Sequence, residues 1–434
     1  MQRNKSSYKL SAAFHEKIFH FSAGYLPPDK IESALTIFQS EADRHFFTSE
    51  SEANLIRILS NMFDKASLIG DCVNYPHYAE ILVAVASNSN YLTDILVRNP
   101  EYFYSIINPS DLKLKLVEDV FSKKLKARTE SLKSFSSKLH VLRTIKRNEI
   151  LKIGVKDILG LETLEDVTKQ LALLAKIISA QLFSLCYEEV IQRKGLKKAN
   201  GSYCILSLGK LGGRELNYSS DIDLIIFYDY NHKLSNSKSY EEFLTEVTHL
   251  FIESISSHSG DGFLYRVDFR LRPDGKNSPL CRSLGEYLNY YESKGEDWER
   301  QMLIKADYLT GSEELYSQFV NYLSAFIYPS SFRISPTEQI KKLKQNIEKN
   351  LADDENIKLI PGGIRDIEFS VQALQLLNGG RLKSLRTGNT LNAIISLHKE
   401  KIISGKEQRN KNSGKKSDAD RILCLSFHLR TENR

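Results

Sequence analysis

Apolar residues recur at steps of three or four through residues 1–195, the spacing of one face of an α-helix. Glycine and proline are sparse in this part of the chain, and no repeat of fixed period appears. The pattern therefore predicts an irregular helical region with one buried stripe. The clearest stripe consists of Leu164, Val167, Leu171, Leu174, Ile178, Leu182 and Leu185.

The pattern changes after a polar, glycine-containing segment at 197–202. Apolar runs at Tyr203–Leu208 and Asp221–Tyr228, and strict alternation at Phe263–Arg272, are typical of strands. A helical pattern at about 240–255 lies between the last two. Further helices are predicted at about 283–305, 312–327, 335–351, 364–378 and 389–400.

These elements predict an α+β protein, in which a small sheet domain is embedded between a helical N-terminal region and a helical C-terminal region. The expected boundaries are 1–195, 196–310 and 311–403. Residues 404–434 form a polar tail rich in lysine, asparagine and serine, for which a disordered or solvated segment is expected.

Composition indicates an ordinary globular protein of 434 residues, with 41% hydrophobic and 26% charged residues. No apolar run approaches the roughly 20 residues that cross a bilayer, and no signal peptide is expected. A formal charge of +6 is weak evidence for nucleic acid, so neither a membrane nor a nucleic acid is expected as a partner. No CxxC pair occurs, which favours reduced thiols and a cytoplasmic location. The cysteines are Cys72, Cys186, Cys204, Cys281 and Cys424.

Two acids, Asp221 and Asp223, open the second predicted strand. Alternate residues of a strand share a face, so the two carboxylates lie side by side while Ile222 and Leu224 face the core. Such carboxylates repel each other, and strands disfavour aspartate, unless a divalent cation sits between them. Oxygen ligands favour Mg²⁺ or Mn²⁺ over zinc. For an isolated Asp-x-Asp, acids that cap a turn are the alternative.

The third predicted strand places Arg266, Asp268, Arg270 and Arg272 on one face and only apolar residues on the other. An ordinary solvated face would mix Thr, Ser, Lys and Glu. Guanidinium groups bind phosphate oxygens bidentately, so this face is interpreted as a phosphate cradle. Asp268 is the candidate for a third metal-binding carboxylate.

A glycine turn, Gly209-Lys210-Leu211-Gly212-Gly213, lies between the first two predicted strands. Glycines let the backbone approach a phosphate, and Lys210 adds a point charge. The turn lacks the ending of a Walker A loop, and a plain tight turn is the alternative for this segment alone. The residues expected to bind phosphate or nucleotide are Gly209, Lys210, Gly212, Gly213, Ser220, Arg266, Arg270 and Arg272.

The order of strand, glycine turn, Asp-x-Asp strand and third acid resembles the nucleotidyltransferase superfamily that includes polymerase β. This likeness implies two-metal phosphoryl chemistry, with Asp221, Asp223 and Asp268 as catalytic metal ligands. Four longer segments are similar to the signatures of glutamine synthetase adenylyltransferases, and the resemblance covers roughly residues 90–400. The segments are 209–223, 266–273, 296–300 and 361–369.

Members of that family are usually longer, with two nucleotidyltransferase domains in tandem. The amino-terminal domain removes AMP from a tyrosine of glutamine synthetase by phosphorolysis and releases ADP, whereas the carboxy-terminal domain attaches AMP from ATP. The single motif set here, after a long helical region, resembles the amino-terminal half. The resemblance thus implies AMP removal with Mg²⁺ or Mn²⁺ as cofactor. It also implies glutamine synthetase as substrate, the PII signal protein as regulator, and ATP, ADP and phosphate as ligands.

Three alternatives stay open. The same site could attach AMP; the fold could serve another substrate, as in a uridylyltransferase acting on PII or an RNA-directed transferase; or the chain could be a non-catalytic fragment that binds glutamine synthetase or PII. The motifs at 296–300 and 362–369 argue against another substrate, and the intact acids argue against a non-catalytic fragment. The end of the chain, which resembles a truncated family segment at Phe427–Arg434, argues for such a fragment.

Two smaller expectations concern residues of these motifs. Trp298 is expected to be a packing anchor rather than a platform on which a base stacks. Arg365 and Asp366 either orient the active site or fix the helix that carries them.

Overall fold

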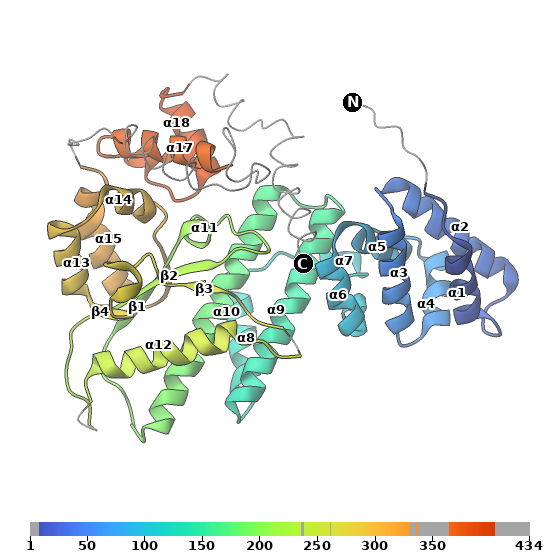
Figure 1. Ribbon diagram of the computed structural model, residues 1–434, viewed down its shortest axis with the longest axis horizontal. Coiled ribbons are helices and arrows are strands. Elements are labelled where there is room, and N and C mark those ends of the chain that lie inside the picture. The colour runs from blue at the N-terminus through green and yellow to red at the C-terminus, as the bar shows by residue number, and fades with distance from the viewer. Residues whose placement is uncertain (1–7, 236–237, 261, 330–335, 337–363, 404–434) are drawn as a thin grey trace. The chain divides into compact units, whose positions relative to one another are not determined.

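The computed structural model describes residues 8–235, 238–260, 262–329, 336 and 364–403. The chain divides into two compact units, one of residues 1–115 and 145–167 and the other of residues 116–144 and 168–434. This division does not follow the expected boundary at 195. Two long helices, α9 (Phe135–Ile158) and α10 (Leu164–Arg193), contribute residues to both units (Figure 1).

The described elements of the first unit are all helices. Side-chain caps begin several of its helices: the oxygens of Ser11, Thr48, Asp64 and Ser89 accept a backbone N–H of the following turn. The elements that precede α9 here are α1 (Ala12–Ser22), α2 (Pro28–Arg44), α3 (Ser49–Asn61), α4 (Lys65–Asn74), α5 (His77–Asn88), α6 (Asn90–Arg98), η1 (Pro100–Ser105) and α7 (Pro109–Leu112).

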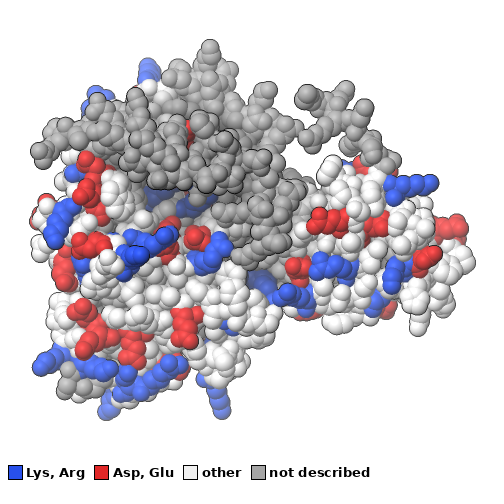
Figure 2. Space-filling model, in the orientation of Figure 1, with Lys and Arg blue, Asp and Glu red and all other residues white. Residues whose placement is uncertain are grey.

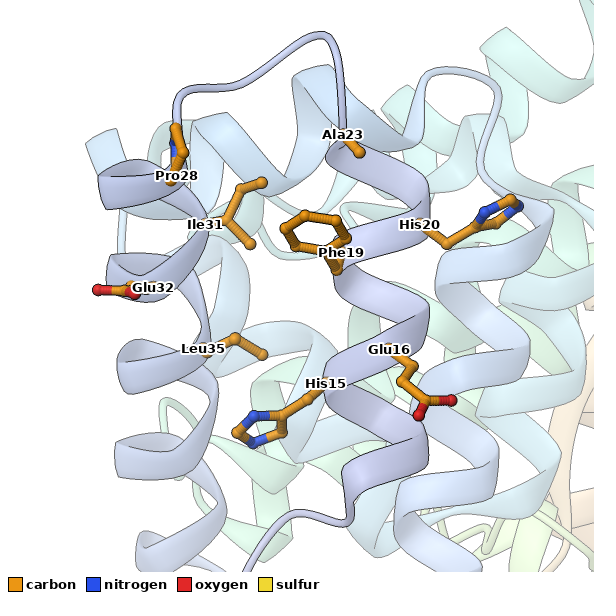
Figure 3. A pocket seen from close by; sticks show the side chains of 9 residues that line it. All are labelled: His15, Glu16, Phe19, His20, Ala23, Pro28, Ile31, Glu32 and Leu35. Atoms are coloured by element: carbon orange, nitrogen blue, oxygen red, sulfur yellow. The ribbon is translucent and has the colours of Figure 1, made fainter.

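A shallow apolar groove runs between α1 and α2 of this unit. Phe19, Ile31 and Leu35 line it, with His15 and Glu32 at its margins (Figure 3). None of the residues predicted to bind metal, phosphate or nucleotide belongs to this groove.

The second unit contains a five-stranded mixed sheet of order β3-β2-β1-β5, with β4 also paired to β2. β1 runs antiparallel to β2 and β5, whereas β2 runs parallel to β3 and β4. A small mixed sheet in a largely helical chain confirms the α+β class. The strands are β1 (Tyr203–Leu208), β2 (Ile222–Tyr228), β3 (Val267–Asp268), β4 (Cys281–Ser283) and β5 (Asp307–Gly311).

Helices cover this sheet. The apolar face of β1 and β2 packs against α13 and α15 around Phe227, Tyr287 and Phe319, while α12 contacts β3 and β4. Most predicted helices are confirmed, but the one at 283–305 is broken at Gly295, where any side chain would press on the Tyr291 carbonyl. The helix at 335–351 and the tail at 404–434 lie outside the described residues. The helices are α8 (Glu118–Glu130), α12 (Tyr240–Ser256), α13 (Leu284–Ser293), α14 (Asp297–Leu303), α15 (Glu313–Ile327), α17 (Ile364–Gly379) and α18 (Thr390–Lys399).

One described helix, α10, is long and apolar enough to cross a membrane by length and composition alone. In the most apolar 18-residue window of α10, 67% is buried inside the protein, as in a core helix. The described cysteines Cys72, Cys186, Cys204 and Cys281 are buried free thiols, as expected. Burial raises the pKa of each of them to about 12.

Candidate functional site

The sheet brings the predicted acids together at the start of β2. Asp223 is paired directly with Asp268 across the parallel ladder of β2 and β3. Paired residues in a sheet project to the same face, so the two carboxylates are neighbours. Asp221 precedes β2 by one residue and is exposed, while Ile222 and Leu224 are fully buried. The burial of these two apolar side chains fixes the register that turns the acids outward.

Two arginines pair with two of these three acids. Arg266 Nε donates to Asp221 Oδ1 at 2.5 Å, and its Nη2 donates to the Ser219 carbonyl at 2.6 Å. Arg270 donates to Asp268 Oδ2 from Nε at 2.8 Å and from Nη2 at 2.5 Å. The Arg270 backbone N–H adds a bond of 2.7 Å to Asp268 Oδ1. Both guanidinium groups lie at the exposed edge of the site.

The ionisation of Asp268 reflects this pairing. Burial raises the pKa of Asp268, but the hydrogen bonds and charge of Arg270 outweigh that effect, so the pKa lies below its ordinary value. Conversely, the hydrogen bond to Asp268 raises the pKa of Arg270, and the charges of Asp223 and Asp221 raise it further. The Arg270 guanidinium therefore interacts electrostatically with all three carboxylates.

Arg272 does not share this face, so the predicted cradle is wrong for that residue. The third strand was expected to span 263–272, but β3 ends at Asp268 and the chain turns. Arg272 is only 6% exposed. Its guanidinium donates to four backbone carbonyls of the same loop, those of Phe269, Lys276, Ser278 and Pro279.

The glycine turn folds into a single helical turn, α11 (Gly209–Gly212), directly after β1. Gly209 has a left-handed backbone with φ +54°, and a methyl group on it would overlap Asp223 Oδ2. Gly212 and Gly213 pack against backbone away from the acids. A side chain at Gly212 would overlap the Lys305 carbonyl, and one at Gly213 would overlap the Gly388 carbonyl. Packing thus requires these two glycines, whereas only Gly209 touches an acid of the site.

The remaining predicted phosphate ligands lie near the same turn. Lys210 is half-buried on α11, and Ser220 is half-buried in the turn before β2. The Ser220 hydroxyl accepts the Asn217 N–H at 3.4 Å. Both residues therefore belong to the segment that leads from β1 to the acids of β2.

Trp298 is not the buried anchor expected from the sequence, because it is 44% exposed. Its neighbours in the motif pack instead. Glu299 is buried and caps the start of α14 by accepting the Glu296 N–H at 2.7 Å. The Arg300 guanidinium stacks over the Phe326 ring, 4.0 Å from its centroid. Arg365 and Asp366 lie in the first turn of α17, partly buried.

The donor chemistry of the site fits a hard divalent cation. Asp221, Asp223 and Asp268 supply carboxylate oxygens from adjoining strand ends, the ligands that Mg²⁺ and Mn²⁺ prefer. In the arrangement described, Arg266 and Arg270 engage two of these carboxylates. No three His, Cys, Asp or Glu side chains among the described residues stand in position to hold one ion together. Metal binding by all three would therefore require their carboxylates to lie closer together than they do in this arrangement.

Sequence comparison places this site in a known family. The family profile described as "Glutamate-ammonia ligase adenylyltransferase" matches residues 79–322, a stretch that contains all five strands and every acid and arginine of the site. The chain belongs to this family. The resemblance expected from the sequence is thereby confirmed, and the members that the profile describes are nucleotidyltransferases.

Curated relatives carry the name "Bifunctional glutamine synthetase adenylyltransferase/adenylyl-removing enzyme". The relative from Shewanella woodyi is 33% identical over 333 residues, which cover 74% of this chain and 34% of that protein. The relative from Psychromonas ingrahamii is 32% identical over 317 residues, covering 70% of this chain and 33% of that protein. The chain thus spans about a third of the length of the curated relatives it matches.

A second profile, described as "GlnD PII-uridylyltransferase", matches residues 333–416. The described part of this stretch includes α17 and α18. The segment 361–369, of which the structure describes residues from Ile364 on, lies inside this match. That segment therefore does not separate adenylyltransferases from uridylyltransferases, contrary to the interpretation of the sequence alone.

Sequence reasoning also missed a buried lysine with two half-buried carboxylate partners beside the glycine turn. Lys305 contacts Glu215 and Glu368 through its amino group. Glu215 belongs to a recognised motif segment, but nothing in its pattern indicated a buried partner. Lys305 is a single lysine after an apolar run, which is the common pattern of a surface position.

Proposed function

We propose that this chain removes AMP from an adenylylated tyrosine of glutamine synthetase by phosphorolysis. Phosphate attacks the adenylyl phosphorus, the bond from that phosphorus to the tyrosine oxygen breaks, and the products are ADP and the free tyrosine side chain. The observation that carries the proposal is the in-register pair Asp223–Asp268, with Asp221 beside it and Gly209 against Asp223. Family membership supplies the class of reaction, and the names of the relatives include adenylyl removal as well as attachment.

In the proposed mechanism, Asp221, Asp223 and Asp268 hold Mg²⁺ or Mn²⁺. A divalent ion held there would supply charge neutralisation for the phosphoryl oxygens and for the departing tyrosinate. Arg266 and Arg270, once released from the acids, bind the phosphate dianion and orient it toward the adenylyl phosphorus. Lys210 adds positive charge at the turn.

The charge state of Asp268 supports removal over attachment. Attachment needs a base that takes the proton of a tyrosine hydroxyl, whose ordinary pKa is about 10. The pKa of Asp268, the nearest candidate base, lies below its ordinary value while Arg270 is bound to it, and a carboxylate that binds a cation instead is likewise a weak proton acceptor. Phosphate near neutral pH is already a nucleophile and needs only to be positioned.

Partners and location complete the proposal. Glutamine synthetase is the proposed protein substrate, ATP, ADP and phosphate the small-molecule ligands, PII the proposed regulator, and the cytoplasm the proposed compartment. On the face of the molecule drawn in Figure 2, lysines and arginines lie interspersed with aspartates and glutamates. Such mixing is consistent with a protein substrate, and the described residues visible on that face form no basic stripe for a nucleic acid.

One pair of assays tests the direction. The chain is incubated with adenylylated glutamine synthetase, phosphate and Mg²⁺, and separately with unmodified glutamine synthetase and ATP. We expect phosphate-dependent ADP in the first and little pyrophosphate in the second. Pyrophosphate without ADP would reverse the direction. A third arm with PII and UTP tests the activity named by the second profile, and turnover only there would refute the proposal.

A further inference from the structure

Lys305 is a buried cation at the junction of three segments of the second unit. It follows α14, is 3% exposed, and its Nζ donates to carboxylates of both Glu215 and Glu368. Glu215 lies two residues after the glycine turn, and Glu368 lies on α17. Burial lowers the pKa of Lys305, but the charges of Glu368 and Glu215 outweigh it, so the lysine stays protonated. The cluster joins the sheet domain to the C-terminal helices.

The second carboxylate oxygen of Glu215 continues this connection into α18. Thr390, the first residue of α18, donates its N–H to Glu215 Oε2 at 3.0 Å and its hydroxyl to Oε1 at 3.0 Å. Asn389, the N-cap of α18, donates its Nδ2 to the Gly213 carbonyl at 3.0 Å. The start of α18 is therefore bonded to the end of the glycine turn.

Backbone contacts fix the same turn against Lys305. A side chain at Gly212 would overlap the Lys305 carbonyl, and one at Gly388 would stand 3.2 Å from the Lys305 Cα. The turn thus has no room to slide past Lys305 in the described arrangement. At its other end, Gly209 rests on the Asp223 carboxylate. A shift of the turn would move the backbone that touches an acid of the site.

Lys305 supplies the positive charge that holds Glu215 and Glu368 together. One lysine and two glutamates carry a net charge of −1, and the bonds from Thr390 stabilise the excess. Without the lysine, two half-buried carboxylates would lie near each other and lack its positive charge. Removing one partner of a buried ionic group leaves uncompensated charge, and the segments that carry it would separate.

We propose that Lys305 is a positioning residue for phosphate and nucleotide: it clamps the glycine turn between the sheet domain and helices α17 and α18, so that Gly209 stays against Asp223. This inference deepens the proposed function and rests on it. It makes the C-terminal helices part of the site's architecture, although they contribute none of its acids.

The chain offers a matched control for a merely structural role. Lys156 is also 3% exposed and pairs with buried Glu162 at 2.8 Å, but this pair belongs to the helical first unit. Lys156→Met should therefore reproduce the loss of a buried ion pair without disturbing the glycine turn. Lys305→Met and Lys156→Met are compared in thermal unfolding, in binding of a fluorescent ADP with Mg²⁺, and in the KM for phosphate during ADP release.

We expect both variants to lose thermal stability, but only Lys305→Met to weaken ADP binding and raise the phosphate KM, each by about tenfold or more. Glu368→Gln keeps the shape of its side chain and loses one charge, so it should show a smaller change in the same direction. It serves as the test variant if Lys305→Met does not fold.

Equal effects of the two lysine variants on ADP binding, or wild-type binding by folded Lys305→Met and Glu368→Gln, would overturn the inference. The outcome for the proposed function is separate. If the wild-type chain binds ADP but releases none from adenylylated glutamine synthetase, the proposed reaction fails. The contrast between Lys305 and Lys156 in ADP binding still decides the positioning role.

Discussion

Gly209 lies against the Asp223 carboxylate so closely that a methyl group on its Cα would overlap Oδ2. Gly209→Ala should therefore abolish ADP release, because the new side chain displaces Asp223 or the turn. Because an alanine is strained in this left-handed backbone, the substitution should also lower the free energy of unfolding by about 1–2 kcal/mol. ADP release and urea unfolding measure the two effects.

A control for that backbone cost is available at Gly195, which has φ +62° and open space around its Cα. Gly195→Ala should lose a similar amount of stability and keep its activity. Equal loss of activity in both variants would show that strain alone, and not the contact with Asp223, explains the effect.

The paired acids predict a second result. Asp221→Asn combined with Asp223→Asn should lower turnover by a factor on the order of 10² or more, because the metal loses carboxylate ligands. The folded state should persist, since the substitution relieves repulsion at an exposed strand end. Circular dichroism and product assays at ordinary Mg²⁺ check this, and wild-type turnover would make the acids structural.

The two arginines after β3 should behave oppositely. Arg272→Ala leaves buried loop carbonyls without donors and should cost about 3 kcal/mol of unfolding free energy. Arg270→Ala, at an exposed side chain, should change stability little and raise the apparent KM for phosphate. Unfolding curves and phosphate titrations distinguish them, and the reverse pattern would place Arg272, not Arg270, at the phosphate.

The lowered pKa of Asp268 predicts a pH dependence. A carboxylate whose pKa is depressed by folding stabilises the protein above its unfolded pKa, and that contribution disappears as pH falls through the folded pKa. Arg270→Ala removes the hydrogen bonds and charge that lower this pKa, so the variant should be slightly less stable than the wild type at neutral pH, and the difference should disappear as pH falls through the folded pKa of Asp268. When Asp268→Asn is added to both proteins, the pH-dependent difference in stability between the wild type and Arg270→Ala should disappear. A difference that persists would come from another titrating group.

Sequence patterns located β1 and β2 to within one residue because continuous apolar runs bounded by polar turns have few alternatives. They failed after Asp268, where the alternation of arginine and apolar residues continues but the backbone does not. The chain turns from Arg270 on; farther along, Pro273 supplies no N–H donor and Asp274 takes a left-handed conformation with φ +59°, so no strand resumes there. Arg272 is then drawn inward to the loop carbonyls.

The acids of the site could be predicted because their spacing matches the period of a strand. The Lys305 cluster could not, since its partners lie far apart in sequence and each is an ordinary charged residue locally. Strands β4 and β5 are short and carry no apolar run, so only their pairing with β2 and β1 defines them.

The first matched profile ends at residue 322 and the second begins at residue 333. Hydrogen bonds of Glu215 and Lys305 connect residues on the two sides of this border, which is called the seam here. Leu376 of α17 also belongs to the apolar core that contains β1 and β2. A fragment that ends at this seam would keep all three acids of the site but would lose Glu368, one of the two partners of Lys305. Exchange of C-terminal regions between adenylyltransferases and uridylyltransferases would likewise succeed only where both parents supply the matching charges. Contacts, more than profile borders, therefore define the smallest portion of this chain that recombination or cloning can move intact.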